Sequence, residues 1–418
     1  MMQFPRLKAT FPEYYELLQG EMKRQRDGLE LIPSENYTSQ AVIEATGSHF
    51  TNKYSEGYPH RRYYGGQEFT DKIEEQAIEK AKKIFKADHA NVQPLSGAIM
   101  NVATYFALLE PGDTILGMDL SHGGHLTHGH PVTAMYKVFN FVRYKTDQSK
   151  GGVIDYDNLR EMALEHKPKL ILAGFSAYSR NLDWKKFKEI ADEVGAITMA
   201  DVSHIGGLIA GEAIDNPFDY GFDVMTTTTH KSLRGPRGGV ILCKEKYAKQ
   251  IDKAIFPGLQ GGPLMHSIFA KLICFAEADT PEFKEYSKQV IKNAKVLCDE
   301  LVSLGYVPVN GGTENHLIML DVTKNGLTGR EAETALDKAG MTLNMNMIPD
   351  DPRKPLDPSG IRFGTPAITT RGMKEEEMKR IAHWMDRVLN DSNNEGLLKK
   401  VHSEITEMCK DFPVPGIE

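Results

Sequence analysis

The segment best suited to chemistry is DVMTTTTHKSLRGPRGG, residues 223–239. Its β-branched run ends at His230 and Lys231, and the glycines and proline that follow require a tight loop instead of a continued strand. Two arginines and a histidine near the lysine would lower its ammonium pKa, as a lysine that forms a Schiff base requires. A lone lysine is usually a solvated surface charge. Its surroundings therefore make Lys231 a candidate nucleophile.

A second candidate lies thirty residues earlier, where the apolar stretch GAITMADVSH ends in Asp201 and His204. A carboxylate at the end of a strand could pair with a protonated pyridine nitrogen and keep that ring an electron sink. Taken alone, Asp201 is better explained as a helix N-cap or buried ion-pair partner, and His204 as a hydrogen-bonded core histidine. The two residues indicate chemistry only together with Lys231.

These side chains need a framework that brings several strand ends together. Between about residues 87 and 240, apolar runs alternate with amphipathic stretches: HANVQPLS, DTILGM, KLILAGF, GAITMADVSH, DVMTTTTH and GGVILC. This alternation predicts an α/β fold with a mostly parallel sheet, which binds ligands at the carboxyl ends of its strands. Polar residues or glycines follow several runs there: Ser96, Gly97, Ser176, Asp201, His204, His230 and Lys231.

A smaller α+β domain is expected in the C-terminal part. The stretch EFKEYSKQVIKNAKVLCDELVSLG has helical periodicity up to Gly305, YVPVN and HLIMLDV indicate strands, and KEEEMKRIAHWMDRVLN and GLLKKVHSEITEMC indicate two amphipathic helices. We therefore expect residues 1–280 to form an N-terminal arm and the large domain, and residues 281–418 to form the small domain.

Composition limits the classes of function. A chain of 418 residues favours two compact units, and 40% hydrophobic with 26% charged residues is typical of globular proteins. A net charge of −7 without a long basic run argues against a nucleic-acid partner. The four widely spaced cysteines indicate reduced thiols, and the N-terminal sequence has no signal-peptide core or membrane span. We expect a cytoplasmic protein with no nucleic-acid or membrane partner.

Seven strings, in the family's order, resemble serine hydroxymethyltransferase from end to end: LIPSENYTS, TNKYSEGYPHRRYYGG, HGGHLTHG, GFSAYS, TTTTHKSLRGPRGG, FPGLQGGP and GIRFGTPAIT. The resemblance implies the type I fold of pyridoxal-phosphate enzymes and a homodimer with shared active sites. It also implies reversible transfer of the serine hydroxymethyl carbon to tetrahydrofolate, which gives glycine and methylenetetrahydrofolate.

The resemblance also implies a role for each motif residue. Lys231 would hold pyridoxal phosphate covalently, Asp201 would pair with the pyridine nitrogen, and His204 would lie beside the phenolic oxygen. Further residues implied at the cofactor are Ser96, Gly97, His125, Ser176, Tyr54 and, from the partner subunit, Gly262. The implied catalytic residues besides Lys231 are Glu56, Tyr64 and His230. Arg362 and Ser34 would bind the substrate carboxylate. The implied folate pocket contains Leu120, Gly124, Leu126 and Asn346.

The chain departs from the family's usual pattern at a few positions. Ala98 stands where many members have a second serine, which removes a hydroxyl donor from the phosphate site. Pro33 replaces a frequent alanine, and Met345 and Met347 replace more polar residues beside the implied folate site.

Alternatives follow from the same residues. Four histidines in HGGHLTHGH could suggest zinc or nickel, but no carboxylate or cysteine accompanies them in that loop, so we expect no metal. A folate-independent pyridoxal-phosphate aldolase or transaldolase would keep Lys231, Asp201 and Arg362. A non-catalytic relative need not have kept these residues together with Glu56.

Overall fold

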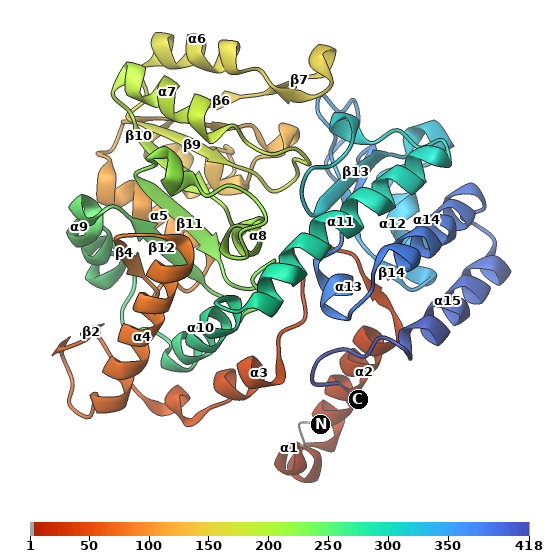
Figure 1. The fold of residues 1–418 in the computed structure, drawn as a ribbon, viewed down its shortest axis with the longest axis horizontal. Helices are drawn as coiled ribbons and strands as arrows, with labels where there is room; N and C mark the ends of the chain where they lie inside the picture. Colours follow the sequence, from red (N-terminus) through yellow and green to blue (C-terminus); the bar gives the residue numbers. More distant parts are fainter. Residues whose placement is uncertain (1–3, 418) are drawn as a thin grey trace. The chain divides into compact units, whose positions relative to one another are not determined.

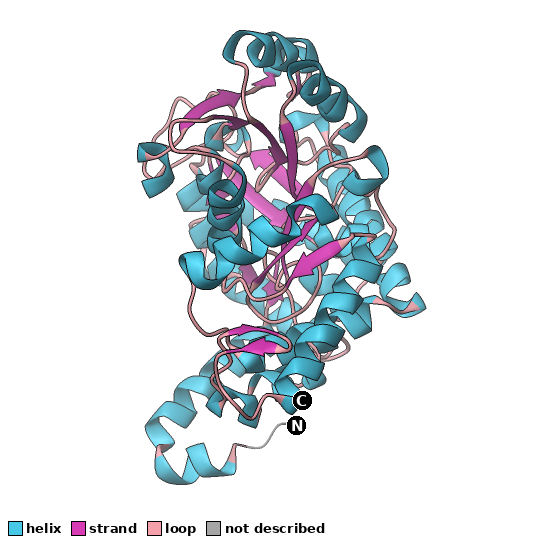
Figure 2. Ribbon diagram, turned by 90° about the vertical axis from the view of Figure 1, so that its left-hand side faces the viewer, coloured by secondary structure: helices cyan, strands magenta, loops and turns pink. Residues whose placement is uncertain are grey.

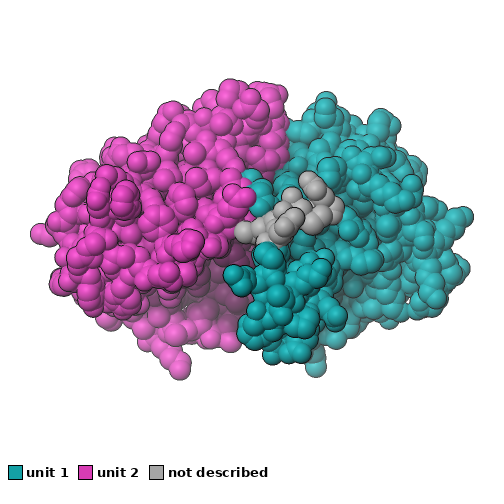
Figure 3. Space-filling view, turned by 90° about the horizontal axis from the view of Figure 1, so that it is seen from below, with its two compact units in different colours: residues 1–40, 289–418 teal, residues 41–288 magenta. Residues whose placement is uncertain are grey.

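The computed structural model describes residues 4–417, and the chain divides into two compact units. Unit 2 comprises residues 41–288, and unit 1 comprises residues 1–40 together with 289–418 (Figure 3). The N-terminal segment thus groups with the C-terminal part of the chain, in contrast to the expected grouping with the large domain. One reason is backbone pairing, because β1 (Leu29–Glu30) runs parallel to β14 (Met341–Thr342).

Unit 2 is built on a seven-stranded sheet with helices on both sides (Figures 1 and 2). In the order β4-β12-β11-β10-β9-β5-β6, strand β12 runs in the direction opposite to the other six. The predicted α/β fold with a mostly parallel sheet is therefore confirmed. The strands, in chain order, are β4 (His89–Asn91), β5 (Thr114–Met118), β6 (Asn140–Tyr144), β9 (Leu170–Gly174), β10 (Ile197–Asp201), β11 (Val224–Thr228) and β12 (Gly239–Cys243).

The helices of unit 2 cover this sheet with apolar faces. Helix α7 (Trp184–Val194) shows the local logic: Asp183 caps its start by accepting from the Lys186 amide, and Gly195 ends it in the left-handed conformation. Its buried face packs on β9 and β10. The remaining elements are α3 (Gln40–Thr46), β2 (Gly57–Tyr58), β3 (Arg61–Arg62), α4 (Glu68–Phe85), α5 (Gly97–Leu108), β7 (Thr146–Asp147), β8 (Val153–Ile154), α6 (Tyr156–His166), α8 (Gly206–Ala210), α9 (Ala248–Lys253) and α10 (Met265–Ala278).

Unit 1 contains a three-stranded antiparallel sheet in the order β13 (Leu317–Asp321), β16 (Gly360–Gly364) and β15 (Asn344–Asn346). Its core is one apolar cluster formed by this sheet and the surrounding helices. The helices are α1 (Pro5–Thr10), α2 (Pro12–Asp27), α11 (Pro281–Ser303), α12 (Gly329–Lys338), α13 (Pro366–Thr370), α14 (Glu375–Asn390) and α15 (Glu395–Cys409); the first residues of α11 belong to unit 2.

The predicted C-terminal elements are largely confirmed. The long helix, the strand HLIMLDV and the two final helices occur as α11, β13, α14 and α15. The predicted strand YVPVN is wrong. A short 3₁₀ helix, Val309–Gly311, occupies its end, and Asn310 has a φ of 64°, a left-handed conformation that interrupts an extended strand. Within residues 4–417, no helix combines the length and apolar character needed to cross a membrane.

Candidate active site

Several candidate residues of unit 2 gather at the carboxyl ends of three adjacent strands. Asp201 is the last residue of β10, and its register partners are Gly174 at the end of β9 and Thr226 of β11. Because these strands are parallel, the loops that leave them begin at one edge of the sheet. Those loops carry Ser176, His204, His230 and Lys231.

Asp201 is buried and held by four hydrogen bonds. Its Oδ2 accepts from Asn101 Nδ2 at 2.8 Å and pairs with His128 Nε2 at 3.0 Å, and its Oδ1 accepts from the Ser203 amide at 3.1 Å and hydroxyl at 2.6 Å. Burial raises the pKa of Asp201, but the hydrogen bond to His128 and the positive charges of His128 and His125 outweigh it. The pKa therefore lies well below its usual range, and the site holds a carboxylate.

The N-terminus of α5 lies beside this edge. Gly97, its first residue, is so close to the end of β11 that a Cβ there would be 2.8 Å from the methyl carbon of Thr228. Ser96 is the N-cap, and its Oγ accepts from the Ile99 amide. A helix N-terminus offers backbone amides and the positive end of the helix dipole to an anion. Ser96 and Gly97 are thus placed where a phosphate group can bind.

The loop that carries Lys231 is restrained from several sides. The guanidinium of Arg234, whose φ is 61°, stacks over the ring of Tyr286 at 4.1 Å. Ser232 Oγ donates to the carbonyl of His204 at 3.0 Å and accepts from the Gly207 amide at 2.9 Å. These contacts join the loops after β10 and β11, so Lys231 is presented on a fixed backbone.

His230 precedes this lysine and is half-buried. Burial, together with the positive charges of Arg237 and Lys231, lowers the pKa of His230 to about 3. The imidazole is therefore neutral near pH 7, and it can both donate and accept a hydrogen bond.

The loop of four histidines meets a carboxylate that lies far from it in sequence. His125 caps a short 3₁₀ helix, Leu126–His128, through Thr127. The ligand atoms of His125, His128 and Asp201 lie within 4.8 Å of one another, which is the one such group found in residues 4–417. The histidine loop contains no carboxylate in its own sequence, but folding brings Asp201 next to it. The expected absence of a metal stays a prediction.

Three folate candidates border the same loop. Leu120 begins a 3₁₀ helix, Leu120–His122, directly after β5 and Asp119. Gly124 is required by close packing, because a Cβ there would lie 2.2 Å from the carbonyl oxygen of Met118. Leu126 has an exposed fraction of 43%. An exposed leucine beside the cofactor candidates is suited to an apolar ligand surface.

Tyr54, Glu56, Tyr64 and Gly262 form a cluster at the surface of unit 2, in which the two tyrosines are exposed. Tyr54 Oη donates to Glu56 Oε1 at 3.2 Å, and this hydrogen bond raises the pKa of Tyr54. The rings of Tyr54 and Tyr64 meet edge to face with centroids 5.2 Å apart, and a Cβ at Gly262 would lie 3.4 Å from the Tyr54 ring. The two rings are 57% and 50% exposed. The structure therefore brings these four candidates together on an open surface.

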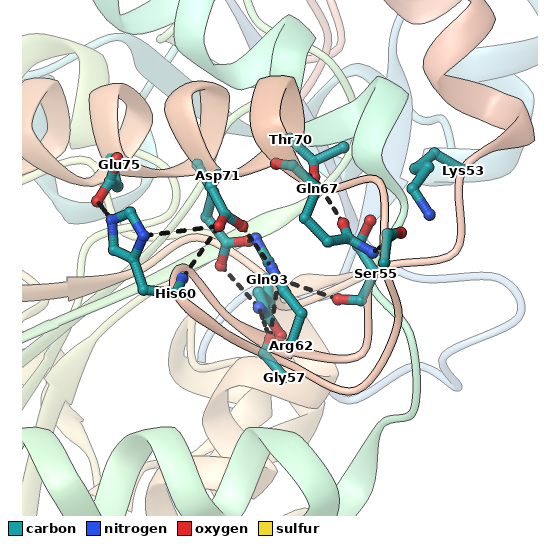
Figure 4. A network of polar contacts seen from close by, with 12 residues as sticks. Lys53, Ser55, Gly57, His60, Arg62, Gln67, Thr70, Asp71, Glu75 and Gln93 are labelled. Carbon is teal, nitrogen blue, oxygen red and sulfur yellow. Dashed lines mark hydrogen bonds and ion pairs between the residues drawn. The ribbon is translucent and has the colours of Figure 1, made fainter.

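A buried ion-pair network supports this cluster (Figure 4). Arg62 Nε donates to Asp71 at 2.8 Å and Nη2 to Glu74 at 2.6 Å, which fixes the β2–β3 hairpin on α4. Arg62 Nη1 also donates, at 2.9 and 3.0 Å, to the carbonyls of the two residues that flank Glu56. The backbone of Glu56 is therefore held on both sides although the surface around it is open.

Unit 1 carries the remaining candidates. Arg362 lies in β16 opposite Asn344 of β15, and its Nε donates to the Asn344 side chain at 3.1 Å. Burial lowers the pKa of Arg362 to about 10, so the guanidinium remains charged at neutral pH. Asn346 lies two residues along β15, opposite Gly360.

Ser34 belongs to the same part of unit 1. It lies in the turn after β1, where the Gly364 amide at the end of β16 donates to the carbonyl of Leu31 at 2.7 Å. A Cβ at Gly364 would lie 2.8 Å from Pro33 Cβ, so glycine allows the turn to approach the strand. Ser34 and Arg362 are therefore on segments that touch.

Sequence reasoning missed two residues that organise the site. Asn101, in the apolar helix α5, donates to Asp201 and to Thr127 Oγ1 and accepts from Thr226. A polar amide among apolar neighbours is the signal that could have drawn attention to it. His128 was visible only as one of four histidines, because its pairing with Asp201 spans 73 residues.

Residues 7–385 match the sequence model of the serine hydroxymethyltransferase family. The chain therefore belongs to this family of pyridoxal-phosphate-dependent transferases, which act on serine and glycine in one-carbon metabolism.

Proposed function

We propose that this member of the serine hydroxymethyltransferase family binds pyridoxal phosphate covalently on Lys231 and transfers the hydroxymethyl carbon of serine reversibly to tetrahydrofolate, leaving glycine. The observation that carries the proposal is the buried, ionised Asp201 at the end of β10, one strand from the loop of Lys231. A buried carboxylate of this kind suits a protonated pyridine nitrogen. The loop lysine suits the aldehyde carbon at the other side of the ring.

The other cofactor candidates also fit this group. The N-terminus of α5, with Ser96 and Gly97, suits the phosphate, and His125 suits one face of the ring. His204, on the loop after β10, suits the phenolic oxygen of the ring, and Ser176, on the loop after β9, is a further polar partner for the cofactor. In the proposed homodimer, Tyr54 and Gly262 of one subunit complete the cofactor site of the other, which is supported by the exposure of Tyr54 in the single chain.

Each side chain then has a defined task. Pyridoxal phosphate, when bound, supplies an electron sink for the charge left on the substrate Cα as the Cα–Cβ bond breaks. Asp201 keeps the ring nitrogen protonated. Arg362, helped by Ser34, holds the serine carboxylate with the two-pronged geometry of a guanidinium.

Proton transfer falls to the exposed cluster. Glu56, oriented by the hydroxyl of Tyr54 and the adjacent ring of Tyr64, moves a proton at the hydroxymethyl oxygen. His230, neutral at working pH, supports Lys231 in the same reaction. Leu120, Gly124, Leu126 and Asn346 contact tetrahydrofolate.

Absorbance spectroscopy tests the proposal. The purified protein should show the visible band of a lysine-bound cofactor, and a further red-shifted band should appear with glycine only after a reduced folate is added. Lys231→Ala should lose the first band and turnover while keeping the fold.

The folate-dependent transferase, the folate-independent aldolase and the non-catalytic relative predict different results in this experiment. A glycine response independent of folate would favour the aldolase, and a protein that never takes up the cofactor would favour a non-catalytic relative. A Lys231→Ala protein with the wild-type band and full turnover would show that another lysine holds the cofactor.

A further inference from the structure

Lys271 is a charged side chain in the core of unit 2. Lys271 lies in α10 and is 2% exposed. Its Nζ donates to the carbonyls of Val92 at 2.7 Å, Pro94 at 3.0 Å and Gly239 at 3.0 Å. A buried lysine is rare unless its charge is compensated, and here three carbonyl oxygens compensate it.

The three acceptors belong to the two segments that frame the proposed phosphate site. Val92 and Pro94 precede the N-cap of α5, whereas Gly239 ends the loop that follows Lys231 and begins β12. The carbonyl of Pro94 also accepts from the Gly239 amide at 3.0 Å. Lys271 therefore links residues 92–94, which lead to the proposed phosphate site, with Gly239 at the end of the loop that carries Lys231.

Gln260 completes this restraint from another direction. Its Oε1 accepts from the Leu95 amide at 2.9 Å, and its Nε2 donates to the carbonyl of Gln93 at 3.1 Å. Consecutive backbone groups of residues 92–95 are thus bound by two side chains that are distant in sequence. A preorganised loop of this kind loses less conformational entropy when it binds a ligand.

The three hydrogen bonds of Lys271 need its charged form. An ammonium has three hydrogens, one for each carbonyl, whereas a neutral amine has two hydrogens and a lone pair that would face the third oxygen. Burial lowers the pKa of Lys271 to about 7, against the opposing effect of the Glu74 carboxyl on α4. His230, on the loop after β11, also faces this charge.

We propose that Lys271 is a positioning residue for cofactor binding: its three hydrogen bonds hold residues 92–96 so that Ser96 and the first amides of α5 face the phosphate. This inference rests on the proposed function. It assigns Lys271 no contact with substrate or cofactor. Its effect passes through the backbone.

Two measurements on a variant test this role. In Lys271→Met, which keeps the chain length and removes the donors, we expect about tenfold weaker binding of pyridoxal phosphate to the apoprotein, and hydrogen exchange of amides 95–100 about tenfold faster. The control is Lys288→Met, which removes an exposed lysine paired with Glu285 on α11. It should change neither quantity. Wild-type affinity and exchange in Lys271→Met would overturn the inference.

The wild-type protein gives an independent test that does not require the methionine variant to fold. Amides 95–100, corrected for intrinsic rates, should exchange faster as the pH rises through about 7, where the folded-state pKa of Lys271 lies. Lys271→Arg keeps its charge at these pH values and should remove this dependence. A flat wild-type profile together with wild-type exchange in Lys271→Met would overturn the inference. A wild-type protein that binds no pyridoxal phosphate, but shows this exchange profile, would instead overturn the proposed function.

Discussion

Replacing Asp201 with asparagine keeps the side-chain shape and removes the charge on which the candidate site depends. The carboxylate accepts from Asn101 and His128 on one oxygen and twice from Ser203 on the other. An asparagine has a single acceptor atom, so its NH₂ group must face donors on one side. The variant therefore loses both the charge and half of the hydrogen bonds.

The magnitude follows from burial. Removing one partner of a buried charge pair destabilises a fold by roughly 3 kcal/mol. We expect the free energy of unfolding of the variant at pH 7 to be lower by about that amount. Because the folded-state pKa of Asp201 lies below its unfolded value near 4, its stabilisation is present above that pH and is lost as the pH falls. The difference between wild type and variant should therefore shrink below about pH 4.

The Asp201→Asn substitution should also lower kcat, independently of its effect on stability. Without the carboxylate, the ring nitrogen of the cofactor loses its counter-charge, and removing one such electrostatic group lowers kcat by roughly a hundredfold or more. The assays are urea unfolding of the apoprotein without added cofactor, and the visible cofactor band and folate-dependent cleavage of serine at saturating pyridoxal phosphate.

Asp223→Asn is the matched control. Asp223 is also buried, and it accepts from the Thr198 amide and hydroxyl at 3.1 and 3.0 Å and pairs with Lys244 at 3.2 Å. It precedes β11 and so lies at the opposite edge of the sheet. Its variant should lose stability but keep turnover. Wild-type turnover in Asp201→Asn, with the control behaving as expected, would refute the assignment of the pyridine partner.

Three further predictions address the remaining candidates. Arg362→Ala should lower kcat/KM for serine by roughly 3 kcal/mol, about 150-fold, and Arg362→Lys should recover only part because an ammonium lacks the two-pronged geometry; unchanged kinetics in both would place the carboxylate elsewhere. Glu56→Gln should still bind serine, as seen in its effect on the cofactor spectrum, but lose folate-dependent cleavage; normal turnover would make Glu56 structural. Mixing Lys231→Ala with Glu56→Gln should restore about a quarter of wild-type activity, because half of randomly exchanged dimers carry one intact site. Mass spectrometry of tagged chains would verify exchange, and exchanged dimers without activity would mean that each site is built within one chain.

The sequence by itself determined the main strands and helices and the residue types at their ends, although the strand expected at YVPVN did not form. The runs KLILAGF, GAITMADVSH and DVMTTTTH occur as β9, β10 and β11, because short β-branched or apolar runs bounded by glycine and polar residues suit buried parallel strands. Asp201 and Lys231 could be placed at one edge of the sheet, because parallel strands end on the same side. The position and end of a strand can be predicted from a local pattern, because they depend mainly on neighbouring residues in the sequence.

Only the tertiary structure decided which distant groups meet. The pairing of Asp201 with His128 spans 73 residues, the hydrogen bond from Lys271 to Val92 spans 179, and the pairing of Leu29 with Met341 joins an N-terminal segment to the C-terminal part of the chain. Each depends on strand order and on how helices cover the sheet, which no local spacing encodes. The protonation of these groups follows from burial and from charges brought near by folding, so it too is a property of the folded chain.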